Sequence, residues 1–165
     1  MSKRNHLRLL GCALVFLAVP AMGADDVGIE RMATCQDSWF DWQSKDPAKL
    51  KAFAEHFHAA FTQKADDPFF TPKAETGIAG LRITQVFPGS VGMGVGFSVF
   101  VDATFDKARQ TLAKRLAKPL SKCETSDGMR TCELPVAAQR TVTLMAEDKP
   151  GASQTLIGCY YFYEK

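Results

Sequence analysis

The sequence of 165 residues lacks the short patterns that most often carry enzyme chemistry. It has no G-x-S-x-G stretch for a serine nucleophile, no CxxC pair of the thioredoxin or zinc-binding kind, and no conspicuous pair of carboxylates. His56 and His58 would stand about 200° apart around a helix, whereas two ligands of one metal need a spacing of three or four residues. We therefore expect no catalytic, cofactor or metal site and no enzyme activity.

The sequence also lacks an apolar run of the roughly 20 residues that a membrane-spanning helix needs. Its apolar run from Leu9 to Val19 follows three bases and no acid, and it precedes Pro20 and the small residues at 21–24. This order is typical of a secretory signal peptide. Cleavage after Gly23 puts small residues at both positions that require them, and cleavage after Ala24 is the alternative. We expect residues 1–24 to be removed and residues 25–165 to reach the periplasm, with no transmembrane segment.

Cys12 raises a different possibility, because Leu9-Leu10-Gly11-Cys12 is similar to the lipobox at which bacterial lipoproteins are acylated. However, the apolar stretch continues past Cys12 to Val19, and little apolar sequence precedes it. We therefore prefer the interpretation in which Cys12 is part of the apolar stretch of a signal peptide. The mass of the mature protein distinguishes the two.

Neither sign of charge is in clear excess outside the expected signal peptide. The whole chain carries 20 Lys and Arg against 18 Asp and Glu, and three of those bases precede residue 25. The remainder has 17 bases against 18 acids, which is a net charge of −1. Charge therefore does not point to nucleic acid as a partner. The remaining length of about 141 residues, with no linker or repeat, fits a single domain.

Four cysteines lie outside the expected signal peptide, and an even number in an exported chain favours two disulfides. Cys123 and Cys132 are symmetric about Asp127-Gly128, a dipeptide favoured in two-residue hairpin turns. Counting outward from the turn makes them a directly opposed, non-hydrogen-bonded pair with Cα atoms about 4.5 Å apart, which a disulfide can bridge. We predict Cys123–Cys132 and, by elimination, Cys35–Cys159.

Hydrophobic periodicity and turn residues predict an α+β fold. Helices are expected over 29–43, from Pro47 to about Gln63, and from about Thr104 to before Pro119. Strands are expected over 81–87, 91–101, the two arms of the hairpin at 123–132, 141–146 and 155–163. Residues 66–79 are expected to form a loop, and residues 88–90 a turn. This order suggests one domain with an antiparallel sheet of about five or six strands and helices packed on one face.

Glycines recur at every second position of one predicted strand. Gly92, Gly94 and Gly96 alternate with apolar residues and so clear one face of the sheet of side chains. Phosphate-binding loops need their glycines at a turn before a helix, so the pattern indicates no nucleotide site. Two interpretations stay open. Either a helix or a large aromatic side chain from a neighbouring strand packs on the bare backbone, or a ligand or partner segment lies in this trough.

Two other surfaces are candidates for recognition. Lys107, Lys114 and Lys118 lie within about 40° of one another around the expected helix, so they form a solvated face or a contact for an anionic partner. Aromatic residues do not interleave with these bases, which disfavours nucleic acid.

Tyr161 and Tyr163 belong to four consecutive aromatic residues of the last strand, of which two project from each face. If helices cover only one face, an aromatic pair is left exposed as an anchor for a protein contact.

These features rank three functions. The first is a periplasmic binding or inhibitory module that contacts another envelope protein, as a hydrolase inhibitor or an immunity-type protein does, with a homodimer as one possible state. The alternative is a carrier of a small apolar molecule or lipid, which the 12 phenylalanines favour and which requires an enclosed apolar cavity. A small envelope enzyme stands third, and it would need His56 or His58 beside a carboxylate or a serine in a cleft.

Overall fold

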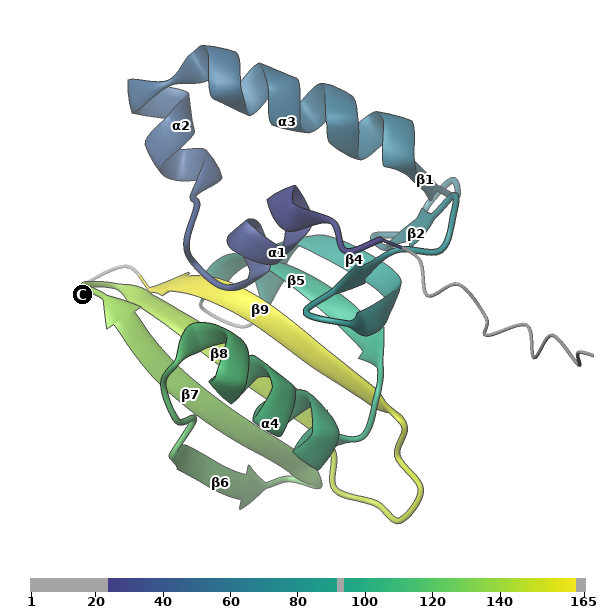
Figure 1. The fold of residues 1–165 in the computed structure, drawn as a ribbon, viewed down its shortest axis with the longest axis vertical. Helices are drawn as coiled ribbons and strands as arrows, with labels where there is room; N and C mark the ends of the chain where they lie inside the picture. The colour runs from purple at the N-terminus through teal and green to yellow at the C-terminus, as the bar shows by residue number, and fades with distance from the viewer. Residues whose placement is uncertain (1–23, 92–93, 163–165) are drawn as a thin grey trace, which may run out of the picture.

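The computed structural model of the chain describes residues 24–91 and 94–162 (Figure 1). The expected signal peptide, Cys12 and the candidate residues Gly92 and Tyr163 lie outside the described residues. In chain order the elements are α1 (Val27–Ala33), α2 (Trp39–Lys45), α3 (Pro47–Ala60), β1 (Phe61–Gln63), β2 (Phe70–Pro72), β3 (Gly77–Ile78), β4 (Leu81–Val91), β5 (Gly94–Asp102), α4 (Phe105–Leu116), β6 (Lys122–Ser126), β7 (Met129–Ala137), β8 (Arg140–Glu147) and β9 (Gln154–Phe162).

The strands form one sheet in the order β1-β2-β4-β5-β9-β8-β7-β6, with β3 paired to β4. All these strand pairs are antiparallel, and a single isolated bridge between Asp25 and Gly77 is parallel. Over the residues described, the sheet therefore has nine strands, and the prediction of five or six is wrong. The three additional strands, β1 to β3, are only two or three residues long. Such short strands have no readable alternation and exist because a neighbouring strand supplies their hydrogen bonds.

The predicted helix over residues 29–43 is two helices, because the chain turns sharply between them. Cys35 has a left-handed backbone with φ of 58°, which no continuous helix accommodates. Ser38 then restarts the helix by accepting a hydrogen bond from the Asp41 amide at 3.2 Å. The following helix, α3, begins as predicted, with Asp46 as its N-cap and Pro47 in its first turn. No helix among the described residues is long and apolar enough to cross a membrane.

The turn expected at residues 88–90 is also wrong, because β4 continues through it to Val91. Pro88 pairs with Phe97 of β5, and its ring is tolerated because β4 has little pairing on its other side. On that side β2 pairs with β4 at Phe70, which lies opposite Val86. The glycine-rich strand β5 consequently lies in the middle of the sheet, between β4 and β9.

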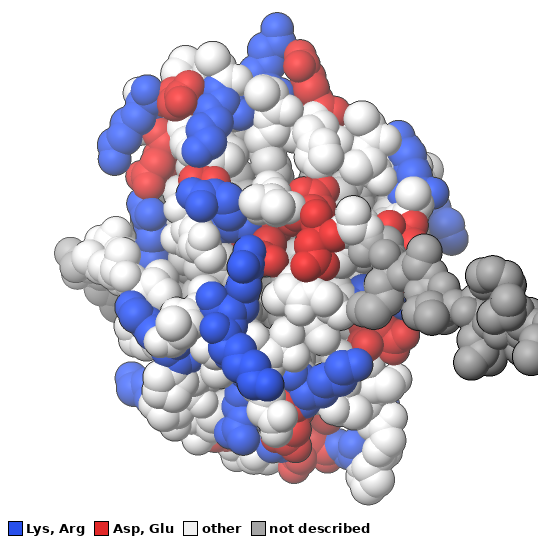
Figure 2. Space-filling view, in the orientation of Figure 1, with Lys and Arg blue, Asp and Glu red and all other residues white. Residues whose placement is uncertain are grey.

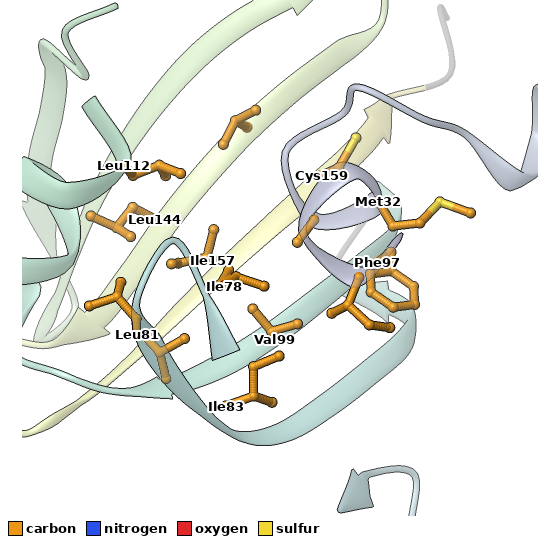
Figure 3. Packing of buried hydrophobic residues seen from close by; sticks show 14 of the residues in the cluster. Met32, Ile78, Leu81, Ile83, Phe97, Val99, Leu112, Leu144, Ile157 and Cys159 are labelled. Carbon is orange, nitrogen blue, oxygen red and sulfur yellow. The ribbon is translucent and has the colours of Figure 1, made fainter. Parts of the chain in front are cut away.

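The helices lie on one face of the sheet (Figure 1). Helices α1 and α4 contact β9, and the Phe57 ring of α3 lies 6.2 Å from the Phe97 ring of β5. The strand side chains beneath them are fully buried and form the centre of the core (Figure 3). They include Val99, Leu144 and Ile157. We call the opposite side of the sheet, turned away from these helices, the rear face.

Both predicted disulfides are confirmed. Cys123 and Cys132 stand opposite each other in the β6–β7 hairpin, with Cα atoms 4.0 Å apart. Asp127 and Gly128 form its turn with φ of 52° and 73°, the left-handed pair that a type I′ turn requires. The Cys35–Cys159 bridge, with Cα atoms 5.0 Å apart, ties the segment after α1 to the central strand β9 across 124 residues.

Candidate binding groove

The glycine trough of β5 is filled at Gly96 by an aromatic ring from the neighbouring strand. Tyr160 of β9 is opposite Gly96, and its ring is so close that a Cβ built on Gly96 would lie 2.7 Å from it. A Cβ on Gly158 would meet the same ring at 2.9 Å. The Tyr160 hydroxyl shares a buried hydrogen bond of 2.7 Å with the Ser98 hydroxyl. At Gly96, therefore, the first interpretation of the glycine pattern is confirmed.

A groove of about 610 Å³ lies farther along the rear face. Its walls carry six large apolar side chains that are partly exposed and come from five strands and from the segment before β2. These are Phe69, Phe87, Phe100, Met129, Met145 and Leu156. The groove is open to solvent, and its lining residues include none from a helix.

The strand register explains why these side chains meet. Phe100 and Met145 are both direct partners of Leu156, so three adjacent strands present an apolar side chain at one level. Phe69 reaches the same face from outside the sheet, with its ring 5.3 Å from that of Phe87 and 5.7 Å from that of Phe100. From β4 to β7 the groove crosses four strand spacings, or about 19 Å.

The groove has one polar end, at the turn between β8 and β9. Glu147 and Lys149 form an ion pair there, and Ser153 and Gln154 complete the edge. The Gln154 amide is held in place by donating to the Thr84 hydroxyl at 3.1 Å. An apolar groove with a few polar groups at one end can bind an apolar group and orient what is attached to it. Its two methionines can adapt their shape to the occupant.

Tyr161 does not belong to the groove. Its position in β9 places it on the helix-covered face, where it is half-buried and packs against the core. The Arg140 guanidinium lies 5.4 Å from the ring, and burial raises the pKa of the Tyr161 phenol. Tyr160, its neighbour in the strand, lies on the rear face and is buried there against Gly96 and Gly158.

The three lysines are exposed, on the side of the molecule opposite the groove. Lys107 and Lys114 project from α4, whose inner face packs on β8 and β9. Lys118 lies beyond the helix, because α4 ends at Leu116 and Ala117 adopts a left-handed backbone with φ of 51°. The helical angle predicted for Lys118 therefore does not apply.

His56 does have a carboxylate partner, and that carboxylate also caps the helix α1. Its Nε2 atom lies 2.7 Å from one oxygen of Asp26, and the other Asp26 oxygen accepts the Ile29 amide at the start of α1. The imidazole is more than half exposed, and neither His56 nor His58 lines the groove. Across residues 24–91 and 94–162, no three His, Cys, Asp or Glu side chains are placed to share a metal ion.

The groove is a site that sequence patterns did not locate. One signal was available, because Phe100 interrupts a strand face that otherwise carries only glycine and serine. An apolar residue on a face cleared of side chains marks a place where something packs, but the other five wall residues lie far apart in the chain.

Comparison with protein-family models, with curated proteins and with solved structures found no match for this chain.

Proposed function

We propose that the protein is an exported binding or inhibitory module that holds another envelope protein by taking an apolar part of it into the groove. The single observation that carries this proposal is the cluster of six partly exposed apolar side chains on the rear face. Burial of such surface is the dominant favourable contribution to most protein association. The two disulfides support both export and a rigid binding surface, since disulfides persist in oxidising compartments and rigidity lowers the entropy lost on binding.

The shape of the groove favours a protein partner over an enclosed cargo. A carrier surrounds its ligand, whereas this groove is open to solvent and about 19 Å long. An inserted side chain or the apolar edge of a helix would bury its contact atoms there and leave its backbone attached to the partner. Interface hot spots likewise centre on a few large side chains that lose their contact with water when the partner binds.

The volume of the groove favours a second candidate, the binding of a small apolar molecule. Ligand pockets commonly measure about 300–1,000 Å³, and about 610 Å³ lies within that range. A small apolar dye such as N-phenylnaphthylamine distinguishes the candidates. Saturable 1:1 fluorescence enhancement that Met145→Glu abolishes, without any protein partner, would favour the small molecule.

The protein-contact proposal is tested by placing a photo-crosslinking amino acid at Met145 or Phe100 in the groove and, as a control, at exposed Lys51 on α3. After irradiation in cells, both groove positions are expected to give the same discrete adduct with another envelope protein, and position 51 is expected to lack it. With that partner purified, Met145→Glu should weaken binding by about tenfold or more, because it places a charge among apolar contacts.

The matched control for the binding measurement is Lys51→Glu, which alters charge away from the groove and should leave the affinity within twofold. The proposal is overturned if the groove positions give no adduct beyond that of position 51. It is also overturned if Met145→Glu and Lys51→Glu bind the partner equally well.

A further inference from the structure

The outer surface of α4 carries three lysines that have no acidic partner among the residues the structure describes. Lys107, Lys114 and Lys118 are exposed, and none forms an ion pair with any residue the structure describes. Lys107 lies in the first turn of α4, where the helix dipole disfavours a positive charge. The stability of the helix therefore does not account for this lysine.

Two acids beside this surface are already paired with arginines. Glu30, which is buried, binds the Arg115 guanidinium, and Asp106 pairs with both Arg109 and Arg130. The hydrogen bond to Glu30 raises the pKa of the Arg115 guanidinium, and a third acid, Asp25, lies close enough to raise it further. Basic side chains consequently gather over α4 (Figure 2), and acidic ones lie beside them, toward α1. We call the set Lys107, Lys114, Arg115 and Lys118 the α4 basic surface.

A cleft of about 250 Å³ opens at the C-terminal end of this surface. Arg115 and Lys118 line it from one side, and Leu134 and Val136 of β7 line it from the other. Its lining contains no Asp or Glu, so a carboxylate that entered would meet two cations and an apolar wall. The Nε of Arg115 donates a hydrogen bond to Glu30. About half of the Arg115 side chain is exposed, and its two terminal nitrogens are also hydrogen-bond donors that a carboxylate could contact.

We propose that the α4 basic surface binds an acidic segment of a protein, with one carboxylate in the cleft and others along the lysines. Lys107 and Lys114 are seven residues apart, or about 10.5 Å along the helix. This spacing exceeds the Debye length at physiological salt, so the lysines act as separate contacts for a chain of carboxylates. The proposal is independent of the groove, which lies on the rear face.

An anionic membrane is a less suitable partner for this surface. Basic segments that bind acidic lipid headgroups carry roughly four to eight Lys and Arg, and the α4 basic surface, whose four cations include Arg115 already paired with Glu30, is at the lower end of that range. Membrane-associating surfaces also insert large apolar side chains. Among the described residues, the exposed large hydrophobic residue is Val27 of α1, which is outside the α4 basic surface.

The test uses fluorescein-labelled decaglutamate and the mature protein, with binding followed by anisotropy at low and at physiological salt. Wild type is expected to bind, more weakly as salt rises. The variant K107E/K114E/K118E should lose about tenfold or more in affinity, since three favourable contacts become repulsive. The matched control K45E/K51E/K64E makes the same change in net charge on exposed lysines elsewhere and should stay within twofold of wild type.

Single substitutions Lys107→Gln, Lys114→Gln and Lys118→Gln provide a second set that leaves the fold unstressed, and each should weaken binding about two- to threefold. Met145→Glu in the groove should not change decaglutamate binding, so the two proposals fail separately. If the triple variant and its control lose the same affinity for decaglutamate, net charge alone explains the loss and the proposal is overturned. Binding to phosphatidylglycerol vesicles without binding to decaglutamate would overturn it in favour of a membrane.

Discussion

The two disulfides are expected to contribute very unequally to stability, because they close loops of different length. Replacing both cysteines of a bridge by alanine frees the unfolded chain from that closure, and the entropy regained grows with the logarithm of the loop length. For Cys35–Cys159, with a separation of 124 residues, the chain-entropy relation gives about 5 kcal/mol. For Cys123–Cys132, with a separation of 9, it gives about 2.5 kcal/mol.

Burial increases the difference between the two bridges. Cys35 and Cys159 are both buried, whereas in the second bridge Cys132 is buried and Cys123 lies exposed on the edge strand β6. Removing a sulfur atom from the core also leaves a small cavity, so C35A/C159A leaves two such cavities and C123A/C132A leaves one. The variant C35A/C159A should therefore lose at least about 2 kcal/mol more of its unfolding free energy than C123A/C132A.

Urea unfolding of the oxidised wild type and the two double variants measures this difference, with circular dichroism as the signal and the slope of each transition compared. Wild type reduced and alkylated serves as the reference without either bridge. The reasoning is refuted if C123A/C132A is destabilised as much as C35A/C159A, because loop length would then not govern the effect.

Two further predictions concern Tyr160 on the rear face. Gly96→Ala should lower the unfolding free energy by about 1–3 kcal/mol, because the new Cβ would lie 2.3 Å from the Cys159 carbonyl oxygen and 2.7 Å from the Tyr160 ring. An unchanged urea midpoint would contradict that packing. In addition, burial raises the pKa of the Tyr160 phenol, a shift that its hydrogen bond with Ser98 partly offsets. Above pH 10 the unfolded chain therefore loses this proton before the folded one does, and stability should fall as pH rises through the raised pKa. Tyr160→Phe should reduce that fall, and equal slopes of stability against pH for wild type and variant would show that the phenol is not buried.

The two proposed contact surfaces lie on opposite sides of one sheet. The groove faces away from the helices, and the α4 basic surface covers the outer side of a helix on the other face. A partner held in the groove therefore leaves α4 accessible. If both proposals hold, the domain can contact two partners, or two separate parts of one partner, at the same time.

Local signals were sufficient for the elements whose structure depends on neighbouring residues. The turn at Asp127-Gly128 aligns the two arms of its hairpin, and that register alone brings Cys123 opposite Cys132. The N-cap Asp46 and the proline after it start α3 at the expected residue. Each of these signals acts over a few residues, so a single sequence is enough to interpret it.

Other predictions failed because a distant partner overrode the local preference. Proline and glycine at residues 88–89 favour a turn, but pairing with β5 keeps the backbone extended there. Residues 34–38 could continue a helix by periodicity, but the Cys35–Cys159 bridge accompanies a left-handed backbone at Cys35 that ends α1. The strands between residues 61 and 78 were missed because their hydrogen-bond partners lie elsewhere in the chain.

The amino-acid sequence by itself determined the fold class, the pairing of the four cysteines and the exposed basic residues of α4. Each of these follows from periodicity, from turn chemistry or from an even cysteine count. Only the tertiary structure decided that Tyr160 packs on Gly96 and that six apolar side chains form a groove. Those side chains come from positions between 69 and 156, and only the order and register of the strands bring them to one face.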